Sequence, residues 1–222
     1  MTPFELLKTA CHAACRQTPA CAPSYRAMLK TENISQMMAV WREYWEDISG
    51  GKYADIINDR LPAAYPTLRK EMNAAGIYVN ECPKVAPEFV RVLVTDCDHI
   101  VDIYDYAKCY VLGRATVRAW GHSQVYSDRC DKAIIELYDY AYGHVSKGWV
   151  KAEHYTKLWT SADAVVNGCV MCESYGGTVK AHAYRKIEAH GDTHVYASAT
   201  RNIRLYDNAA IHRLLTQVKQ DL

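Results

Sequence analysis

The stretch Gly113–Asp128, GRATVRAWGHSQVYSD, consists of two eight-residue units with the same pattern. In each unit a large apolar residue lies between two small residues at alternate positions. The two units are Ala115-x-Val117-x-Ala119 and Ser123-x-Val125-x-Ser127. Because side chains alternate between the two faces of a β-strand, the three residues of a unit share one face. The stretch therefore predicts two short strands, each with a buried face of small, large and small residues.

The same spacing continues through most of the C-terminal half of the chain. Ten of the thirteen steps between central apolar positions are eight residues long, and the exceptions are ten, seven and thirteen. The central positions are Val101, Cys109, Val117, Val125, Ile135, Gly143, Val150, Leu158, Val166, Val179, Ile187, Val195, Ile203 and Ile211. A fixed short period is typical of a solenoid, whose units bury their inner faces against their neighbours. We expect the register to be interrupted from Cys169 to Gly177, and Gly143 is the weakest apolar position.

The residues that follow each centre point outward and indicate how many strands make one turn. With two strands per turn, they separate into a charged wall and an aromatic wall, each with rungs about 4.8 Å apart. The charged wall contains Asp102, Arg118, Glu136 and Lys151, and the aromatic wall contains Tyr110, Tyr126, His144 and Trp159. Three strands per turn would mix the two kinds of residue. The pattern therefore predicts a two-sided coil of sixteen residues per turn, and Glu188 and Arg204 repeat the charge pairing.

Residues from about Val101 to Ile211, with units such as RATVRAWG, resemble the octapeptide-repeat β-solenoids encoded by bacterial and prophage genomes. In those proteins Ala-x-Val-x-Ala recurs, with Gly or Asp at the corners. The resemblance implies a β-solenoid fold, and it implies no catalytic residue because such families share no active site. The aromatic outer residues and the interruption from Cys169 to Gly177 depart from the family pattern.

The N-terminal part of the chain has helical periodicity. Thr2-Pro3-Phe4-Glu5 has the form of a capping box with proline at the first helical position. Further helices are expected over residues 24–30, 34–48, 53–61 and 66–75, the last beginning at Pro66. The predicted fold is therefore α+β, with a helical domain at residues 1–88 and a two-sided β-solenoid at residues 89–222. The spacing of Leu214, Leu215, Val218 and Leu222 predicts a short helical cap on the last turn.

Composition argues against several classes of function. Residues 1–91 carry 11 Lys/Arg and 10 Asp/Glu, and the other 131 residues carry 15 of each, so a nucleic-acid partner is not expected. No apolar run reaches the roughly 20 residues of a membrane-spanning helix. The opening MTPFELLK has no features of a signal peptide, which favours a reduced, cytoplasmic protein with nine free cysteines. Cys11, Cys15 and Cys21, and the pair Cys169 and Cys172, lack a complete set of metal ligands, so we expect neither metal nor cofactor.

The aromatic wall is the candidate binding site. Exposed rings are enriched where proteins dock, although stacked rings also stabilise a β-ladder. We therefore expect a non-enzymatic interaction or structural module that binds a protein or a glycan through Tyr110, Tyr126, His144 and Trp159. Self-association through the solenoid end or outer wall is a further expectation. The alternative is a carbohydrate-active or other hydrolase that uses Asp96, Asp98, Asp102 and Asp105, with His99 among them.

Overall fold

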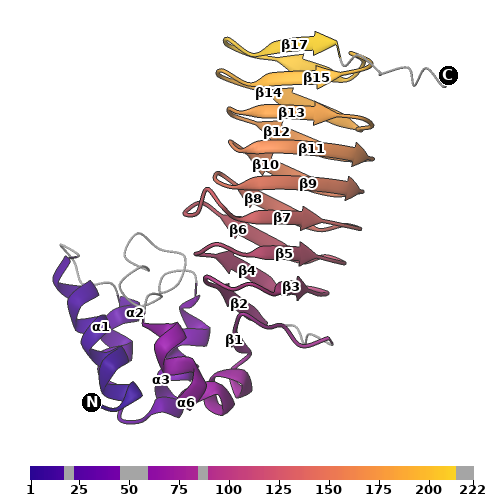
Figure 1. Cartoon of the computed structure of the whole chain (residues 1–222). Coiled ribbons are helices and arrows are strands. Elements are labelled where there is room, and N and C mark those ends of the chain that lie inside the picture. Colours follow the sequence, from indigo (N-terminus) through magenta and orange to yellow (C-terminus); the bar gives the residue numbers. More distant parts are fainter. Residues whose placement is uncertain (18–22, 46–59, 85–89, 214–222) are drawn as a thin grey trace. The chain divides into compact units, whose positions relative to one another are not determined.

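The computed structural model describes residues 1–17, 23–45, 60–84 and 90–213 (Figure 1). The chain divides into two compact units. The first contains residues 1–79 and 89–93, and the second contains residues 80–88 and 94–222. In the described part of the chain, no helix has both the length and the apolar character needed to cross a membrane.

The first unit is built from helices. They are α1 (Pro3–Gln17), α2 (Pro23–Leu29), α3 (Ile34–Glu43) and α6 (Leu61–Ala74). The predicted capping box is confirmed: the Thr2 amide donates to Glu5 Oε2 at 2.7 Å, and the Glu5 amide donates to Thr2 Oγ1 at 3.2 Å. The helices bury a shared core that includes Leu7, Met28 and Trp41. Two short strands, β1 (Ile77–Val79) and β2 (Arg91–Val94), pair in parallel.

Some helices of the first unit begin and end at other residues than expected. Pro66 was predicted to begin a helix, but it lies inside α6, which begins five residues earlier at Leu61. A proline also stands at the start of α6, where the missing N–H has no partner to lose, and this is the start signal that the prediction missed. The expectation of one helix over residues 34–48 is wrong, because α3 ends at Glu43 with Tyr44 as its C-cap. Of the helix expected over residues 53–61, residues 53–59 lie outside the described residues, and Leu61 begins α6 instead of ending a helix. The cap expected at residues 214–222 lies outside the described residues.

The second unit is a parallel β-solenoid with two strands per turn. Strands of one wall, here called the odd sheet, are β3 (Ile100–Ile103), β5 (Thr116–Ala119), β7 (Ile134–Leu137), β9 (Trp149–His154), β11 (Asp163–Gly168), β13 (Thr178–Ala181), β15 (His194–Ala197) and β17 (Ala210–Arg213). Strands of the other wall, the even sheet, are β4 (Lys108–Val111), β6 (Gln124–Ser127), β8 (Tyr142–Val145), β10 (Lys157–Thr160), β12 (Met171–Ser174), β14 (Lys186–Ala189) and β16 (Ile203–Leu205). Each strand from β3 to β15 pairs with the strand two places later, as the stacked arrows in Figure 1 show. Val117 lies opposite Val101 and Val125 opposite Cys109, so the predicted repeat of sixteen residues is confirmed.

The inward residues between the sheets follow the predicted small, large, small pattern, and buried Ser123, Thr160 and Ser174 lie among the apolar side chains. Ala115, Val117 and Ala119 are all buried, and the same alternation recurs on the other strands. Gly143, the weak position of the pattern, is accommodated by a neighbour. An ideal Cβ at Gly143 would lie 2.5 Å from Leu137 Cδ1, so the leucine occupies the space that a larger residue would need.

The expected interruption between Cys169 and Gly177 is wrong. That segment contains β12, and the strand before it is aligned through Ala164 rather than Val166. Ala164 pairs with Val150 and Val179, and Cys172 pairs with Leu158 and Ile187. The prediction failed because Val166 is the more apolar residue of its strand, although Ala164 and Val166 both point inward. Choosing Val166 shifted the register by two residues and concealed one strand.

The turns between strands use left-handed backbone conformations. The corner that follows β3, β5 and β7 has Asp105, Gly121 and Asp139 at φ values of 55°, 67° and 56°. Aspartate and glycine are among the residues that adopt this conformation most readily, which agrees with the Gly or Asp expected at corners. Gly148, just before β9, has φ of 103°, and a Cβ there would lie 2.6 Å from the carbonyl oxygen of Ala133.

Candidate functional site on the even sheet

The four residues predicted to form the aromatic wall lie in one column. Tyr110, Tyr126, His144 and Trp159 occupy equivalent positions on β4, β6, β8 and β10. The distances between successive ring centroids are 5.1, 6.2 and 4.0 Å. The strand register therefore brings all four residues together on the outer face of the even sheet, as expected.

Three further rings continue this column and were not predicted. Tyr175, His190 and Tyr206 each follow directly after a strand of the even sheet. Successive centroid distances from Trp159 onward are 5.0, 4.6 and 4.5 Å. The seven rings, Tyr110, Tyr126, His144, Trp159, Tyr175, His190 and Tyr206, are here called the aromatic column.

Stacking decides which part of each ring is available to a ligand. The planes of Tyr175 and His190 differ by 8°, and those of His190 and Tyr206 differ by 6°. These three rings therefore cover each other's faces, whereas the contacts of His144 and Trp159 within the column are tilted by 33–37°. Tyr175 and Tyr206 are 42% and 39% exposed, whereas Tyr110 is buried.

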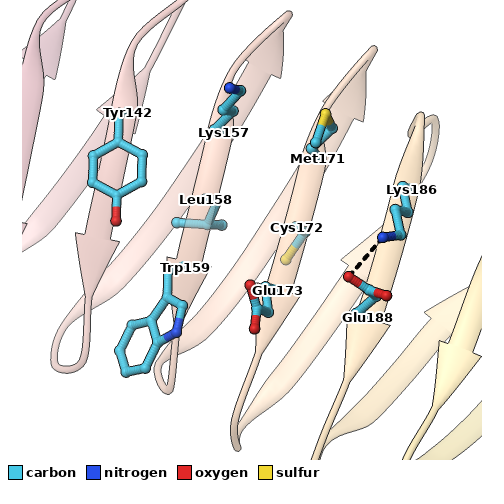
Figure 2. Close-up of a pocket in the computed structure, with 9 residues that line it drawn as sticks. All are labelled: Tyr142, Lys157, Leu158, Trp159, Met171, Cys172, Glu173, Lys186 and Glu188. Carbon is cyan, nitrogen blue, oxygen red and sulfur yellow. Dashed lines mark ion pairs between the residues drawn. The ribbon is translucent and has the colours of Figure 1, made fainter.

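A pocket of about 190 Å³ lies beside the column on the same sheet (Figure 2). Trp159 joins the pocket to the column, because its indole both lines the pocket and stacks between His144 and Tyr175. The lining residues are Tyr142, Lys157, Leu158, Trp159, Met171, Cys172, Glu173, Lys186 and Glu188. Apolar and charged groups thus converge where β8, β10, β12 and β14 lie side by side.

Charges around the pocket are mostly compensated. Lys186 Nζ lies 2.7 Å from Glu188 Oε2, and Arg204 Nη1 lies 3.6 Å from Glu188 Oε1. The hydrogen bond from Lys186 is the main cause of the lowered pKa of Glu188. Glu173 accepts a hydrogen bond from the Tyr175 hydroxyl, and this bond raises the pKa of Tyr175. Both carboxylates of the pocket, Glu173 and Glu188, therefore already accept hydrogen bonds from neighbouring side chains.

His144 lies inside the column and differs electrostatically from a free imidazole. Burial lowers its pKa, and the nearby negative charge of Asp128 opposes that effect only in part. The ring therefore favours its neutral form. A neutral ring stacks between Tyr126 and Trp159 without adding a desolvated charge to the column.

The odd sheet carries the predicted charged ladder. Asp102, Arg118, Glu136 and Lys151 lie on successive strands. Arg118 Nε is 3.2 Å from Glu136 Oε2, whereas Lys151 pairs with Glu153 at 3.1 Å. The related pair Glu188 and Arg204 lies on the even sheet, on the same wall as the aromatic column. Charge and aromatic residues are therefore not separated along the whole solenoid.

A second set of stacked rings lies at the corner after the odd strands and was also missed. Tyr106, His122, Tyr140 and Tyr155 stack with centroid distances of 5.3, 5.2 and 5.4 Å. The three tyrosines are between 56% and 62% exposed. In the sequence, each of these rings directly follows a left-handed corner residue. The prediction considered only strand positions, so it did not include these corner residues.

The acidic segment considered for hydrolysis has structural contacts. Asp96 Oδ1 accepts a hydrogen bond from the Arg114 amide at 2.6 Å, and Asp98 pairs with the Arg114 guanidinium at 2.9 Å. Asp102 Oδ1 accepts from the Trp120 indole N–H at 3.3 Å, and Asp105 forms a corner. His99 Nε2 lies 2.8 Å from the backbone oxygen of Asn80. These contacts bind turns to one another, which is a structural role.

Six described cysteines are free thiols, namely Cys82, Cys97, Cys109, Cys130, Cys169 and Cys172, and the structure gives no account of the side chains of Cys15 and Cys21. Burial raises the pKa of Cys82 to about 11 and that of Cys172 to about 12. A protonated thiol is a poor nucleophile and a poor metal ligand. Cys172, although it lines the pocket, therefore contributes as an apolar group.

Comparison with known proteins gave no relative: no family model, curated protein or solved structure matches the chain. The structure supports the resemblance to octapeptide-repeat solenoids at the level of the fold, a parallel β-solenoid with two strands per turn.

Proposed function

We propose that this protein is a non-enzymatic interaction module that binds a partner protein through the aromatic column and the adjoining pocket. The observation that carries the proposal is the continuous stack of seven rings beside a pocket that shares Trp159 with it. Aromatic residues are enriched in protein interfaces and dominate their binding energy. A shared indole lets one partner side chain enter the pocket while its neighbours contact the column.

The rigidity of the column supports a binding role. Binding normally costs about 0.5–1.5 kcal/mol for each flexible side chain that becomes ordered. Rings held between neighbours on adjacent strands have already lost most of that freedom on folding. Stacking also stabilises the ladder, by about 0.5–1.5 kcal/mol for a favourable aromatic pair. Rings that only stabilise the β-sheet would need no pocket beside Trp159. A surface that binds a partner protein uses such a pocket to receive a side chain.

The geometry favours a protein over a glycan and over hydrolysis. Sugars bind aromatic residues through ring faces, which stacking covers in part, whereas a protein can contact ring edges and hydroxyl groups. The contacts of Asp96 and Asp98 with Arg114 favour a structural role for the acidic segment over catalysis. We also infer a cytoplasmic location, supported by the free thiols, and a bacterial or prophage origin, which rests on the resemblance alone.

The test compares a column variant with a matched variant of the odd sheet. The column variant is Tyr126→Ser with Trp159→Ser, and the control exchanges Arg118 and Glu136. Each protein captures partners from a lysate of the source cell, and an identified partner is then purified and titrated directly. We expect the column variant to lose at least tenfold in affinity and the control to change less than twofold.

A third variant keeps the test decisive if the double substitution lowers stability. Met171→Arg fills the pocket with a long cationic side chain and leaves every ring of the column in place. This variant is also expected to lose the partner, with an unchanged circular dichroism spectrum. Equal binding by the wild type, the column variant and the pocket variant would overturn the proposal.

A further inference from the structure

Two histidines meet on the outer face of the odd sheet, on the wall opposite the aromatic column. His194 begins β15 and His212 lies on β17, the neighbouring strand. They are diagonal neighbours, because His194 lies opposite Ala210 and His212 lies opposite Tyr196. His194 is exposed, and its Nδ1 lies 3.0 Å from Nε2 of His212.

The short contact between the nitrogens requires at least one unprotonated ring. A hydrogen bond between two imidazoles needs a lone pair on one nitrogen, so two imidazolium ions cannot form it. The arrangement therefore directs a neutral nitrogen and a second ring nitrogen toward the same small region. A metal ion that replaces the shared proton would bind both nitrogens.

The distance between the nitrogens allows both of them to bind one transition-metal ion. Bonds between imidazole nitrogen and a divalent transition metal are about 2.0–2.1 Å long. Two such nitrogens are about 2.9 Å apart when the angle at the metal is 90° and about 3.3 Å apart when it is tetrahedral. The 3.0 Å between His194 and His212 is close to the 90° value. Ligands at 90° are the preference of Cu²⁺ and Ni²⁺, whereas structural Zn²⁺ is tetrahedral.

Neighbouring residues hold one ring and leave the other accessible. Tyr196 stacks on His212 with a centroid distance of 4.7 Å and an angle of 23°, which restricts rotation of the His212 ring. His194 lies between Thr178 and Ala210 on the adjacent strands, and neither carries a charge. The nearest cation by register is Lys180, which lies opposite Tyr196 and is exposed to solvent. An ion can therefore approach His194 from solvent.

We propose that His194 and His212 form a two-histidine binding site for Ni²⁺ or Cu²⁺ on the odd sheet. Within the described ranges no group of three or more His, Cys, Asp or Glu side chains is arranged to hold a metal ion. Water therefore completes the coordination, and the ion exchanges readily. This site is independent of the aromatic column and of the partner proposed for it.

The probe is NiCl₂, because Ni²⁺ does not oxidise the free thiols as Cu²⁺ does. Untagged full-length protein, first treated with chelator and then freed of it, is titrated by calorimetry. We expect one Ni²⁺ per chain, and at least tenfold weaker binding by His194→Gln and by His212→Gln. His182→Gln serves as the matched control, because His182 is an exposed histidine outside the pair, and it should change the affinity less than twofold.

A second measurement locates the ion without relying on the variants. Paramagnetic Ni²⁺ broadens NMR signals of nearby nuclei, so the imidazole resonances of His194 and His212 should disappear first. Zn²⁺ should bind more weakly than Ni²⁺ because its tetrahedral angle fits the pair poorly. Absence of saturable Ni²⁺ binding, or binding that survives both glutamine substitutions, would overturn the proposal.

Discussion

Gly143 provides a sharp test of how the narrow core is packed. Its neighbour Leu137 reaches into the space where a side chain would stand, with Cδ1 2.5 Å from an ideal Cβ. Substitution of Gly143 by alanine must therefore displace Leu137, which is fully buried. In a Leu137→Ala background the nearest remaining side-chain atom is Leu158 Cδ1 at 3.4 Å, so the added methyl group makes an ordinary contact. We expect the sign of its effect on stability to reverse between the two backgrounds.

The expected magnitudes follow from opposing contributions. Replacing a strand glycine by alanine stabilises by about 0.5–1 kcal/mol when nothing obstructs the methyl group. Overpacking a close-packed core costs about 1–3 kcal/mol. Gly143→Ala alone should therefore lower the free energy of unfolding by about 1–2 kcal/mol. Leu137→Ala should lower it by about 2–5 kcal/mol, and adding Gly143→Ala to that variant should restore about 1 kcal/mol.

Urea unfolding followed by circular dichroism measures the four proteins of this double-mutant cycle. The coupling between the two positions should be about 2–3 kcal/mol, a size that residues in contact commonly show. A stabilising effect of Gly143→Ala in the wild-type background, or additivity of the two substitutions, would refute the packing described for this rung.

Two further substitutions test the backbone and the column. Gly148→Ala should destabilise by about 2 kcal/mol or more, because φ of 103° disfavours a side chain and the added Cβ would meet the carbonyl oxygen of Ala133. A melting temperature equal to that of the wild type would contradict this. Because burial lowers the pKa of His144, the unfolded chain takes up this proton at higher pH than the folded chain. The contribution of His144 to stability is therefore present above its unfolded pKa of about 6.5 and is lost as the pH falls below that value. Proton NMR should place the midpoint of His144 below that of an ordinary histidine, and His144→Gln should make stability less dependent on pH between 5 and 7.

The architecture could be predicted because one physical requirement acts on every turn. Inward residues must alternate with outward residues, and the turns must stack in register, so Val117 and Val125 already reveal the period. The predicted register was wrong at β11, because the more apolar of two inward residues, Val166, was taken as the central one instead of Ala164. The prediction also failed at Pro66, because a proline in the first turns of a helix and a proline deeper inside it look alike in one sequence.

Four of the seven rings of the aromatic column were predicted from the sequence. The residues Tyr110, Tyr126, His144 and Trp159 each follow a central apolar position, so the spacing of those central positions, which varies from turn to turn, was enough to align them. After Trp159 the column passes to residues two positions later, such as Tyr175, because Glu173 occupies the equivalent strand position. No fixed period predicts such a shift. The contact between His194 and His212 was equally hidden, because diagonal neighbours on adjacent strands are eighteen residues apart.

The turn of sixteen residues also sets how such a chain can change its length. Each strand pairs only with the strands directly above and below it in its own sheet, so one complete turn is a removable unit. Tandem duplication of a segment such as Gly113–Asp128 adds one rung to each wall and leaves the alignment of the others intact. Gain or loss of eight residues instead moves all later strands to the opposite wall and divides both the aromatic column and the charged ladder. We therefore expect insertion or deletion of a whole turn to preserve the two walls, and insertion or deletion of half a turn to disrupt them.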